Sequence, residues 1–451
     1  MDSNTYAALT DKILRLKDDI ALDVGAVVEI KSGDWSNSDD VRSVIKQYYN
    51  QGNLIGTILI GNIAPSCVGY DMGISGNTMT SDFMYADLDG ADPRDNSYSG
   101  FHPENLPEVW IGRITPPTSF GQEKSIQAIA SYLDRNHSFR RKELSFPERG
   151  LFIDSILPED WFYQEVNPQQ IYTDNNAIVL LGESATKANT LSEIQRGWEF
   201  ISIRTHGTAA WQVFPNQDGI LVSPSGQLFG TDLESSPPNA IYVDLTSCGA
   251  GQFSNPDYIA GYYLFSGSVL AVGAPASDVV ASGAGLKLST VQWGLILGEE
   301  LKYYILPAFN FFGDPTLRLR EAPGPVARVS HSRIEIDFGS KPATRDLQQW
   351  LENHRMTECE ITIYNQGEGM LKIAPVSYRL NDTALGGVEG HAMNAFGVSE
   401  AEEASVSPGR STLLKISFGP SLIGVAQCAA VYPTNDPENP YIIIHLIGCG
   451  T

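Results

Sequence analysis

The chain has little of what marks membrane-spanning and nucleic-acid-binding proteins. None of its 451 residues lies in an apolar run that approaches the roughly 20 residues a membrane helix needs. It has 30 lysines and arginines against 53 aspartates and glutamates, a formal net charge of −23. Such a field repels nucleic acids and anionic membranes, and it favours cations such as calcium or basic peptides. Solubility alone is an equally good interpretation of this acidity.

Cysteine is also scarce, and the start of the chain has no recognisable leader. The five cysteines are an odd number, so at least one thiol is unpaired within the monomer. Sequence alone allows Cys67, Cys359, Cys428 and Cys449 either to pair or to stay reduced. Residues 1–19 lack a basic-then-apolar signal layout and begin an amphipathic helix pattern. A chain whose leader had been removed and replaced by Met1 would begin in the same way. Neither feature assigns a compartment.

Helical and strand-like patterns alternate through the first two thirds of the chain. Helices are predicted at residues 6–20, 38–51 and 119–136, and strands at 26–30, 56–63 and 106–114. The alternation restarts with strands predicted at 149–157, 177–183, 199–207, 241–249 and 267–275. This order is typical of an α/β layer structure with a mostly parallel sheet. Ligands bind beyond the carboxyl ends of such strands, so we expect the chemistry in those loops.

The pattern changes after the Ala-Pro-Gly-Pro linker at residues 322–325. Short alternating strands separated by Gly, Pro, Asn and Asp follow it, which indicates a β-sandwich. Residues 343–355 are ambiguous between an inserted helix and a long loop. The predicted domains are therefore an N-terminal α/β subdomain at 1–145, a catalytic α/β subdomain at 146–322 and a β-sandwich at 323–451.

One histidine and one cysteine stand at matching places in this pattern. His206 follows one predicted strand and precedes Gly207, and Cys248 follows the next long strand and precedes Gly249. A thiol with a pKa of about 8.5 is only slightly ionised at neutral pH, so a nucleophilic cysteine needs an imidazole nearby. The backbone N–H groups of Gly207 and Cys248 are the natural donors to an oxyanion. A lone strand-end cysteine is more often structural, and the ordered pair is the stronger signal.

These blocks resemble the caspase-like clan of cysteine peptidases, and within it the gingipain family. The likeness lies in strand–"THG" and strand–"TSCG", with "SDFMYADLDG", "PEVWIGRI" and "FNFFGDPTLRLR" in the same order over residues 50–322. The resemblance implies a caspase-like three-layer α/β sandwich of two side-by-side subdomains, the second of them catalytic. It also implies hydrolysis of peptide bonds through a thioester acyl-enzyme, with no organic cofactor.

The resemblance assigns roles to individual residues. Cys248 corresponds to the nucleophile, His206 to the general base and acid, and the N–H groups of Gly207 and Cys248 to the oxyanion donors. Asp154, in "LFIDSIL", stands where gingipains have the acid that orients the histidine. The alternative for Asp154 is a cap on the segment that follows it.

Two further acids are candidates for the floor of the pocket that selects the residue before the scissile bond. Asp160 lies in the loop after the first catalytic strand, and Asp278 follows the strand after the cysteine. A buried carboxylate favours a cationic partner, so we expect cleavage after lysine or arginine, with Asp278 slightly preferred over Asp160 as the specificity acid.

The stretch "DLDGADPRDNS" is a candidate metal site. Asp87, Asp89, Asp92 and Asp95, with Gly90, form an oxygen-rich loop that calcium could use, although it lacks the spacing of an EF-hand. Some gingipains bind structural calcium. A solvated turn is the alternative interpretation.

The C-terminal region is similar to Ig-like modules of the choice-of-anchor-D type, apart from an insertion at residues 386–404. Such modules bind or anchor, which favours an extracellular or cell-envelope protein over a cytosolic defence protease. A catalytically silent caspase-fold scaffold is the competing function, and a peptidase that needs a partner or cleavage for activity is a third. The sequence does not assign the natural substrate or the oligomeric state.

Overall fold

The structure of the chain is a computed structural model. The residues it describes are 1–52, 54–69, 78–89, 107–156, 168, 172, 176–215, 224–276, 296–302, 309–320, 329–330, 333–341, 358–374, 378–381, 396–398, 404–420, 424–437, 439 and 441–451.

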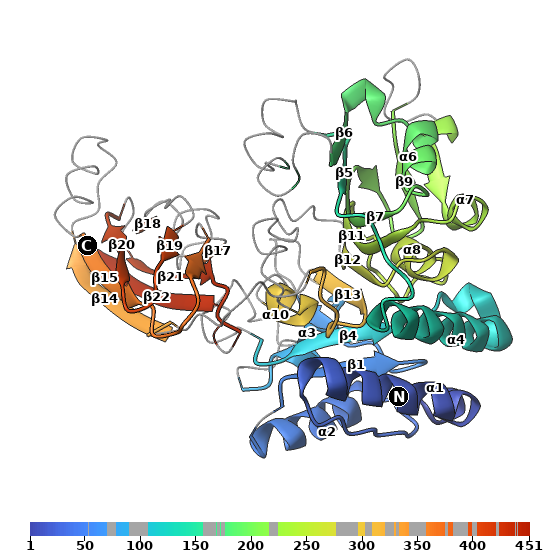
Figure 1. Ribbon diagram of the computed structural model, residues 1–451, viewed down its shortest axis with the longest axis horizontal. Coiled ribbons are helices and arrows are strands. Elements are labelled where there is room, and N and C mark those ends of the chain that lie inside the picture. The colour runs from blue at the N-terminus through green and yellow to red at the C-terminus, as the bar shows by residue number, and fades with distance from the viewer. Residues whose placement is uncertain are drawn as a thin grey trace.

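An eight-stranded, mostly parallel sheet forms the centre of the larger body (Figure 1). Its strands, in spatial order, are β1 (Gly56–Ile60), β4 (Trp110–Ile114), β13 (Phe309–Gly313), β12 (Ala271–Pro275), β11 (Ala240–Thr246), β7 (Trp198–Arg204), β5 (Gly150–Asp154) and β6 (Ala177–Leu181). Only the β12–β13 pair is antiparallel. Every residue of β4, β5, β11, β12 and β13 is buried, as expected for strands covered on both faces.

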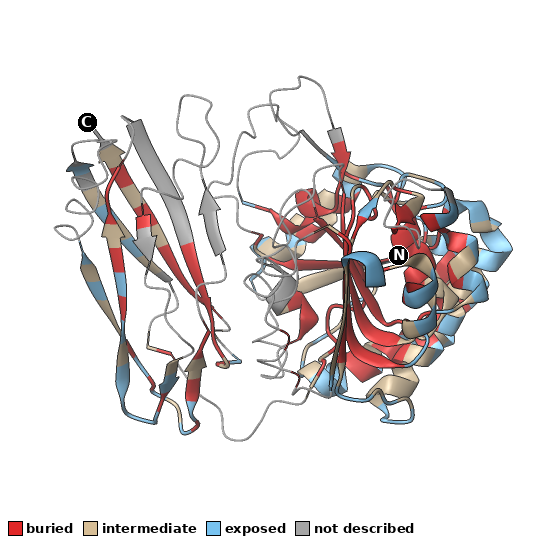
Figure 2. Ribbon diagram, turned by 90° about the horizontal axis from the view of Figure 1, so that it is seen from above, coloured by how far each residue is buried: buried red, intermediate tan, exposed pale blue. Residues whose placement is uncertain are grey.

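Helices cover the sheet and complete the layers. They are α1 (Ser3–Val24), α2 (Ser38–Asn50), α3 (Phe83–Ala86), α4 (Gly121–Arg140), α6 (Lys187–Glu193), α7 (Gly230–Ser235), α8 (Ile259–Ser266) and α10 (Leu297–Lys302). Ile203 and Leu245 pack with α1, α4 and α8 in one core cluster. Phe200 and Tyr242, which point to the opposite face, belong to a second, aromatic cluster. Figure 2 shows these buried strands between the flanking helices.

The helix predictions are confirmed, and α2 shows why the sequence specifies its start. Asn37 accepts a hydrogen bond from the N–H of Asp39, and Asp39 and Asp40 lie in the first turn. The side-chain cap satisfies an exposed N–H group. Acidic residues in the first turn interact favourably with the positive end of the helix dipole. Among the described residues, no helix is both long and apolar enough to cross a membrane.

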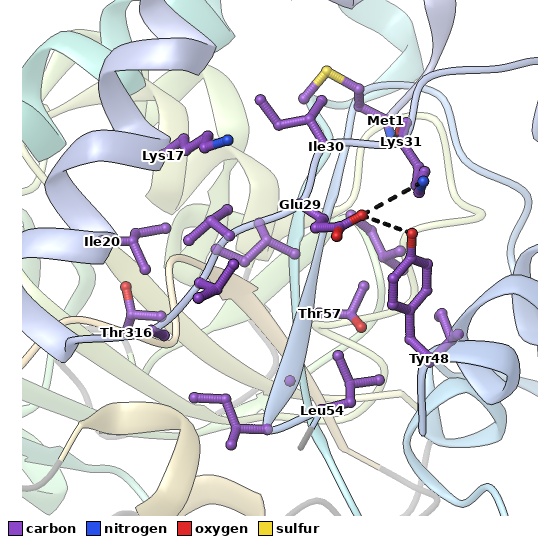
Figure 3. A pocket seen from close by; sticks show the side chains of 18 of the residues that line it. Met1, Lys17, Ile20, Glu29, Ile30, Lys31, Tyr48, Leu54, Thr57 and Thr316 are labelled. Carbon is purple, nitrogen blue, oxygen red and sulfur yellow. Dashed lines mark hydrogen bonds and ion pairs between the residues drawn. The ribbon is translucent and has the colours of Figure 1, made fainter. Parts of the chain in front are cut away.

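The strand predicted at residues 26–30 is wrong. These residues form no strand, and Val27 is 94% exposed. These residues and the edge strand β1 both line a cavity of about 650 Å³ (Figure 3). Glu29 instead accepts a hydrogen bond from Tyr48 at 2.8 Å and pairs with Lys31 at 3.6 Å. An alternating pattern supplies strand propensity, but a strand also needs a partner within hydrogen-bonding distance.

The C-terminal region forms a separate group of β-sheets (Figure 1). One sheet contains β14 (Arg333–Lys341), β22 (Tyr441–Gly450), β21 (Gly424–Pro433) and β17 (Tyr378–Asn381), and another contains β15 (Cys359–Tyr364), β20 (Ser411–Phe418) and β18 (Phe396–Val398). The pair β16 (Leu371–Ile373) and β19 (Ala404–Val406) adds a third. Their apolar faces share one core cluster, consistent with the predicted β-sandwich. The ambiguous segment 343–355 lies outside the described residues.

The central sheet runs across the predicted boundary at residue 145. β4, from the first predicted subdomain, pairs with β13 from the second through Arg113 and Phe312. Two side-by-side subdomains therefore share one sheet, while the boundaries at 145 and 322 stay predictions.

A buried ion pair stabilises the junction between β4 and β13. Arg113 is fully buried, and its guanidinium donates to both carboxylate oxygens of Asp82 at 2.7 Å. The same side chain stacks over the ring of Phe253, 4.1 Å from its centre, and donates to the carbonyl of Ile63 at 3.1 Å. The N–H of Asp82 donates to Asn310 at 3.0 Å. The charges are thus fully partnered, which is the condition under which a buried pair is tolerated.

Removing one partner of this pair is expected to be costly. Asp82→Ala leaves the Arg113 charge buried without its carboxylate, so we expect the free energy of unfolding to fall by about 3–5 kcal/mol. Asp134→Ala is the matched control, because Asp134 pairs with Lys12 and Arg15 at a side-chain exposure of 50% and should cost no more than about 1 kcal/mol. Urea unfolding measures both values, and equal losses would contradict the role of the buried pair.

Candidate active site

Two adjacent parallel strands place His206 and Cys248 at equivalent positions. In the β7–β11 register, Ile203 lies opposite Leu245, and Arg204 lies opposite Thr246. The N–H of Thr205 then donates to the carbonyl of Thr246 at 3.2 Å, which continues the pairing past the strand ends. His206 is the second residue after β7 and Cys248 the second after β11. Both residues therefore leave the sheet side by side at its carboxyl edge, as the sequence predicts for neighbouring strands.

Cys248 lies in a tight turn formed by Ser247–Ala250. The N–H of Ala250 donates to the carbonyl of Ser247 at 3.2 Å, and Gly249, the third residue of the turn, has φ = +64°. A positive φ at this position favours glycine, because other residues pay a steric cost there. The turn leaves Cys248 half-buried with a reduced thiol. The backbone conformation of this turn thus explains why a glycine follows the cysteine.

His206 begins a small antiparallel sheet made of β8 (His206–Gly207), β9 (Trp211–Val213) and β10 (Gln227–Phe229). His206 is exposed, and Gly207 lies opposite Gln212. A Cβ on Gly207 would lie 2.7 Å from the carbonyl oxygen of Trp211 and 3.3 Å from the Cβ of Ser247. Only glycine fits there, and its backbone lies directly against the turn that contains Cys248.

Buried polar side chains tie these loops to the rest of the fold. Gln212 donates to Ser247 Oγ at 3.0 Å and accepts from the Tyr263 hydroxyl at 2.8 Å. Asn310 donates to the carbonyls of Gly251 and Thr80 at 3.0 and 2.9 Å. Sequence reasoning missed Gln212 and Asn310, because an isolated amide in a loop or strand has no pattern that separates it from an exposed residue.

Asp154 ends β5, the other neighbour of β7, and is 1% exposed. It lies in register with Arg204, and its Oδ2 is 3.3 Å from Arg204 Nε. Its Oδ1 accepts from the N–H of Ile156 at 2.8 Å, the contact that the capping interpretation predicts. The structure therefore places Asp154 beside the strand that leads to His206, and its role as the orienting acid stays a prediction.

Asp244 is a second buried acid under the same edge, and sequence reasoning missed it. It lies on β11 between Ser202 and Gly273 of the neighbouring strands, and its side chain is 2% exposed. Burial raises the pKa of Asp244 to about 7, while the charge of Arg204 lowers it. The signal in the sequence was an acid inside the apolar run "AIYVDLT", where a charge is costly unless it is neutralised.

The structure brings together part of the predicted metal loop. Carboxylate oxygens of Asp87, Asp89 and Glu108 lie within 4.8 Å of one another. Burial and the charges of Asp89 and Asp87 raise the pKa of Glu108 to about 7, opposed by the N–H of Leu88, which donates to it at 2.5 Å. Glu108 was missed because it is distant in sequence. The other two predicted ligands, Asp92 and Asp95, lie outside the described residues.

Both candidate specificity acids, Asp160 and Asp278, also lie outside the described residues. The strands before them end at this site. At the end of β12, the carbonyl of Pro275 accepts from the N–H of Gly251 at 2.7 Å. After β5, the Ser155 hydroxyl donates to Thr205 Oγ1 at 2.7 Å. Pro275 and Ser155, which precede the two acids in the chain, therefore lie next to the residue that follows the Cys248 turn and next to the residue before His206.

The raised pKa of Asp244 predicts a pH effect on stability. Unfolded chains ionise an aspartate near pH 4, whereas folded Asp244 keeps its proton until about pH 7, so unfolding releases a proton between these values. Stability should therefore fall as the pH rises from 4 to 7, by up to roughly 4 kcal/mol, since one pKa unit is about 1.4 kcal/mol. Asp244→Asn removes this loss, so its stability relative to wild type should grow over the range.

Denaturant unfolding at pH 4.5 and pH 8 measures this difference. Asp11→Asn, at an exposed position of α1, is the control and should track the wild type at both values. Parallel curves for Asp244→Asn and wild type would show that Asp244 ionises in the folded protein as it does in the unfolded chain.

Comparison with known proteins agrees with this architecture. The model of peptidase family C25 matches residues 20–290. The crystal structure of the Arg-specific cysteine proteinase gingipain R (RgpB) is 12% identical, with 99% of this chain and 96% of that chain covered, at a TM-score of 0.50. A complex of the RgpB pro- and mature domains from Porphyromonas gingivalis is 13% identical, with 99% and 98% covered, also at 0.50. No curated protein matches the sequence.

At these identities the structural likeness shows the fold. The predicted gingipain-like caspase fold is confirmed for the α/β body, and the C-terminal sheets are consistent with a β-sandwich. The likeness of that region to choice-of-anchor-D modules stays a prediction. The family match covers more than half of the chain and includes both His206 and Cys248. The chain therefore belongs to peptidase family C25 and is a cysteine peptidase by family and fold.

Proposed function

We propose that the protein is an endopeptidase in which Cys248 is the nucleophile and His206 the general base and acid. The observation that supports this best is the β7–β11 register, which places both residues at the same distance past adjacent parallel strands. Loops at the carboxyl edge of a parallel sheet are the usual place for catalysis. Gly249 and Gly207 allow the two backbones to turn and approach there.

The reaction uses these groups in sequence. His206 accepts the thiol proton of Cys248, and the thiolate attacks the carbonyl carbon of the scissile peptide bond. The N–H groups of Gly207 and Cys248 donate to the resulting oxyanion, each contributing about 3 kcal/mol to transition-state stabilisation. His206 then gives its proton to the leaving amine. Water, deprotonated by His206, hydrolyses the thioester and returns the thiol.

We assign Asp154 the orienting role, acting on His206 from the neighbouring strand. It ends β5 beside β7, is buried, and lies in register with a residue only two positions before the histidine. A carboxylate near an imidazole favours the productive tautomer and stabilises the imidazolium. Its contact with Arg204 at 3.3 Å keeps the carboxylate in place within the sheet edge.

We further propose cleavage after lysine or arginine, with Asp278 as the preferred specificity acid and Asp160 as the alternative. The hydrogen bond from Gly251 to Pro275 supports Asp278, because it joins the residue after the Cys248 turn to the end of β12, three residues before that acid in the chain. A carboxylate in a pocket that excludes water discriminates strongly for a cationic side chain. The chain's net charge of −23 also attracts basic peptides.

Peptide cleavage tests the proposed function. Wild type should release a fluorophore from peptides ending in Lys or Arg and not from those ending in Asp or Asn. Cys248→Ala should lower kcat/KM by at least about 10⁴-fold and His206→Ala by at least about 10³-fold, since nucleophile and base act as a unit. Cys67→Ala, at an exposed cysteine of β2 (Cys67–Gly69), should leave the rate unchanged.

The competing function is a silent scaffold that keeps the fold without the chemistry. Wild type that is inert toward all four peptides and unlabelled by a thiol-reactive peptide ketone would favour that alternative. Selectivity for basic residues that survives Asp278→Asn would instead remove only the Asp278 assignment.

We also propose that Asp87, Asp89 and Glu108 contribute to a structural calcium site. Three carboxylates within 4.8 Å repel one another, and a divalent cation removes that repulsion and satisfies their oxygens. The sequence places Asp92 and Asp95 in the same acidic stretch. An extracellular or cell-envelope location, which we propose together with an anchoring role for the C-terminal β region, would supply calcium at millimolar concentration.

Calcium should therefore stabilise the protein. At a free calcium concentration 100 times the Kd, a single site adds about 2.7 kcal/mol, and the Tm should rise accordingly. Glu108→Gln should lose most of this gain, whereas Glu123→Gln, at an exposed position of α4, should keep it. Thermal unfolding with calcium, magnesium or EGTA measures the effect, and equal gains in both variants would refute the site.

A further inference from the structure

One buried amide connects the loop of His206 to the loop of Cys248. Gln212 belongs to β9 and is fully buried. In the β8–β9 ladder it lies directly opposite Gly207, the residue after His206. Its Nε2 donates to the hydroxyl of Ser247, the residue before Cys248, at 3.0 Å. Its side chain therefore joins the hairpin that contains His206 to the turn that contains Cys248.

A second bond holds the amide itself in place. The hydroxyl of Tyr263, on α8, donates to Gln212 Oε1 at 2.8 Å, and Tyr263 and Ser247 are fully buried. Buried donors and acceptors are costly to leave unpaired, so the three side chains have one strongly preferred arrangement. Ser247 also opens the Cys248 turn through its own carbonyl. A shift of Gln212 would thus move the turn and the hairpin relative to each other.

The parallel sheet alone does not set this separation. β7 ends at Arg204 and β11 at Thr246, so His206 and Cys248 lie beyond the regular ladder. Past that point, Gly207 approaches Ser247 closely and Gln212 donates a hydrogen bond to Ser247, so both contacts join the two loops. Proton transfer and attack depend steeply on such distances, and a displacement of 1 Å can cost about 100-fold in rate.

We propose that Gln212 is a positioning residue that holds the His206 hairpin against the Cys248 turn, and so keeps the imidazole within proton-transfer reach of the thiol. This inference rests on the proposed Cys248–His206 dyad. Gln212 touches neither the substrate nor the reacting atoms, and it acts through Gly207 and Ser247. Tyr263 supports it by fixing the orientation of the amide.

Gln212→Met tests the inference, because methionine has nearly the same length and volume but forms neither hydrogen bond. We expect kcat to fall about 10- to 100-fold while KM changes less than about threefold, since the dyad and not the substrate pocket is disturbed. The pH profile of Cys248 alkylation by iodoacetamide should move toward that of an ordinary thiol, with a pKa of about 8.5. Cys67→Ala is the background, so that the exposed thiol does not obscure the signal.

Asn136→Leu is the matched control. Asn136 is also a fully buried amide with two described bonds, to Asp314 at 2.9 Å and from Arg140 at 2.9 Å, but it lies on α4. Its replacement should lower the Tm as Gln212→Met does, yet leave kcat and the alkylation profile unchanged. A purely structural Gln212 would behave like this control.

The outcomes separate this inference from the proposed function. If wild type cleaves no peptide and its alkylation profile equals that of His206→Ala, the dyad itself is refuted. If wild type cleaves and His206→Ala shifts the profile, but Gln212→Met keeps the wild-type kcat and profile, only the positioning role is refuted. Should Gln212→Met fail to fold, Tyr263→Phe, which deletes one oxygen, decides: a fall in kcat of about 3- to 10-fold supports the role, and a wild-type kcat and profile overturn it.

Discussion

The parallel pairing of β7 with β11 is the constraint on which the site depends. Because Arg204 lies opposite Thr246, the two chains leave the sheet at the same level, and His206 and Cys248 each lie two positions past that point. A one-residue slip would turn the side chains of a strand to the opposite face and separate His206 from Cys248. The register is fixed by two cores, since Ile203 and Leu245 pack on one face of the sheet and Phe200 and Tyr242 on the other.

Buried polar groups extend this order beyond the regular ladder. Gln212 joins the histidine hairpin to the cysteine turn, and Asn310 ties Gly251 to the junction where Asp82 and Arg113 pair. Each group is paired, so each bond adds geometric definition without leaving an uncompensated charge. Loops that must be precise are thus held by hydrogen bonds where the hydrophobic effect, which has no direction, cannot hold them.

Ionisable groups gather near the same edge for a physical reason. Asp154, Arg204 and Asp244 lie on neighbouring strands under the proposed dyad, where solvent is excluded. Asp154 has an arginine partner at 3.3 Å, whereas burial raises the pKa of Asp244 to about 7. For Asp244 the buried environment, not the residue type, sets the pKa.

The sequence by itself determined the α/β class, most strands and helices, and the positions of His206 and Cys248 just past two long strands, because periodicity and glycine turns are local properties. It failed at residues 26–30, where strand propensity met no partner, and it could not find Gln212, Asn310, Asp244 or Glu108. Only the tertiary structure decided those, since burial and hydrogen-bond pairing arise between segments 20 to 230 residues apart that a local pattern cannot relate.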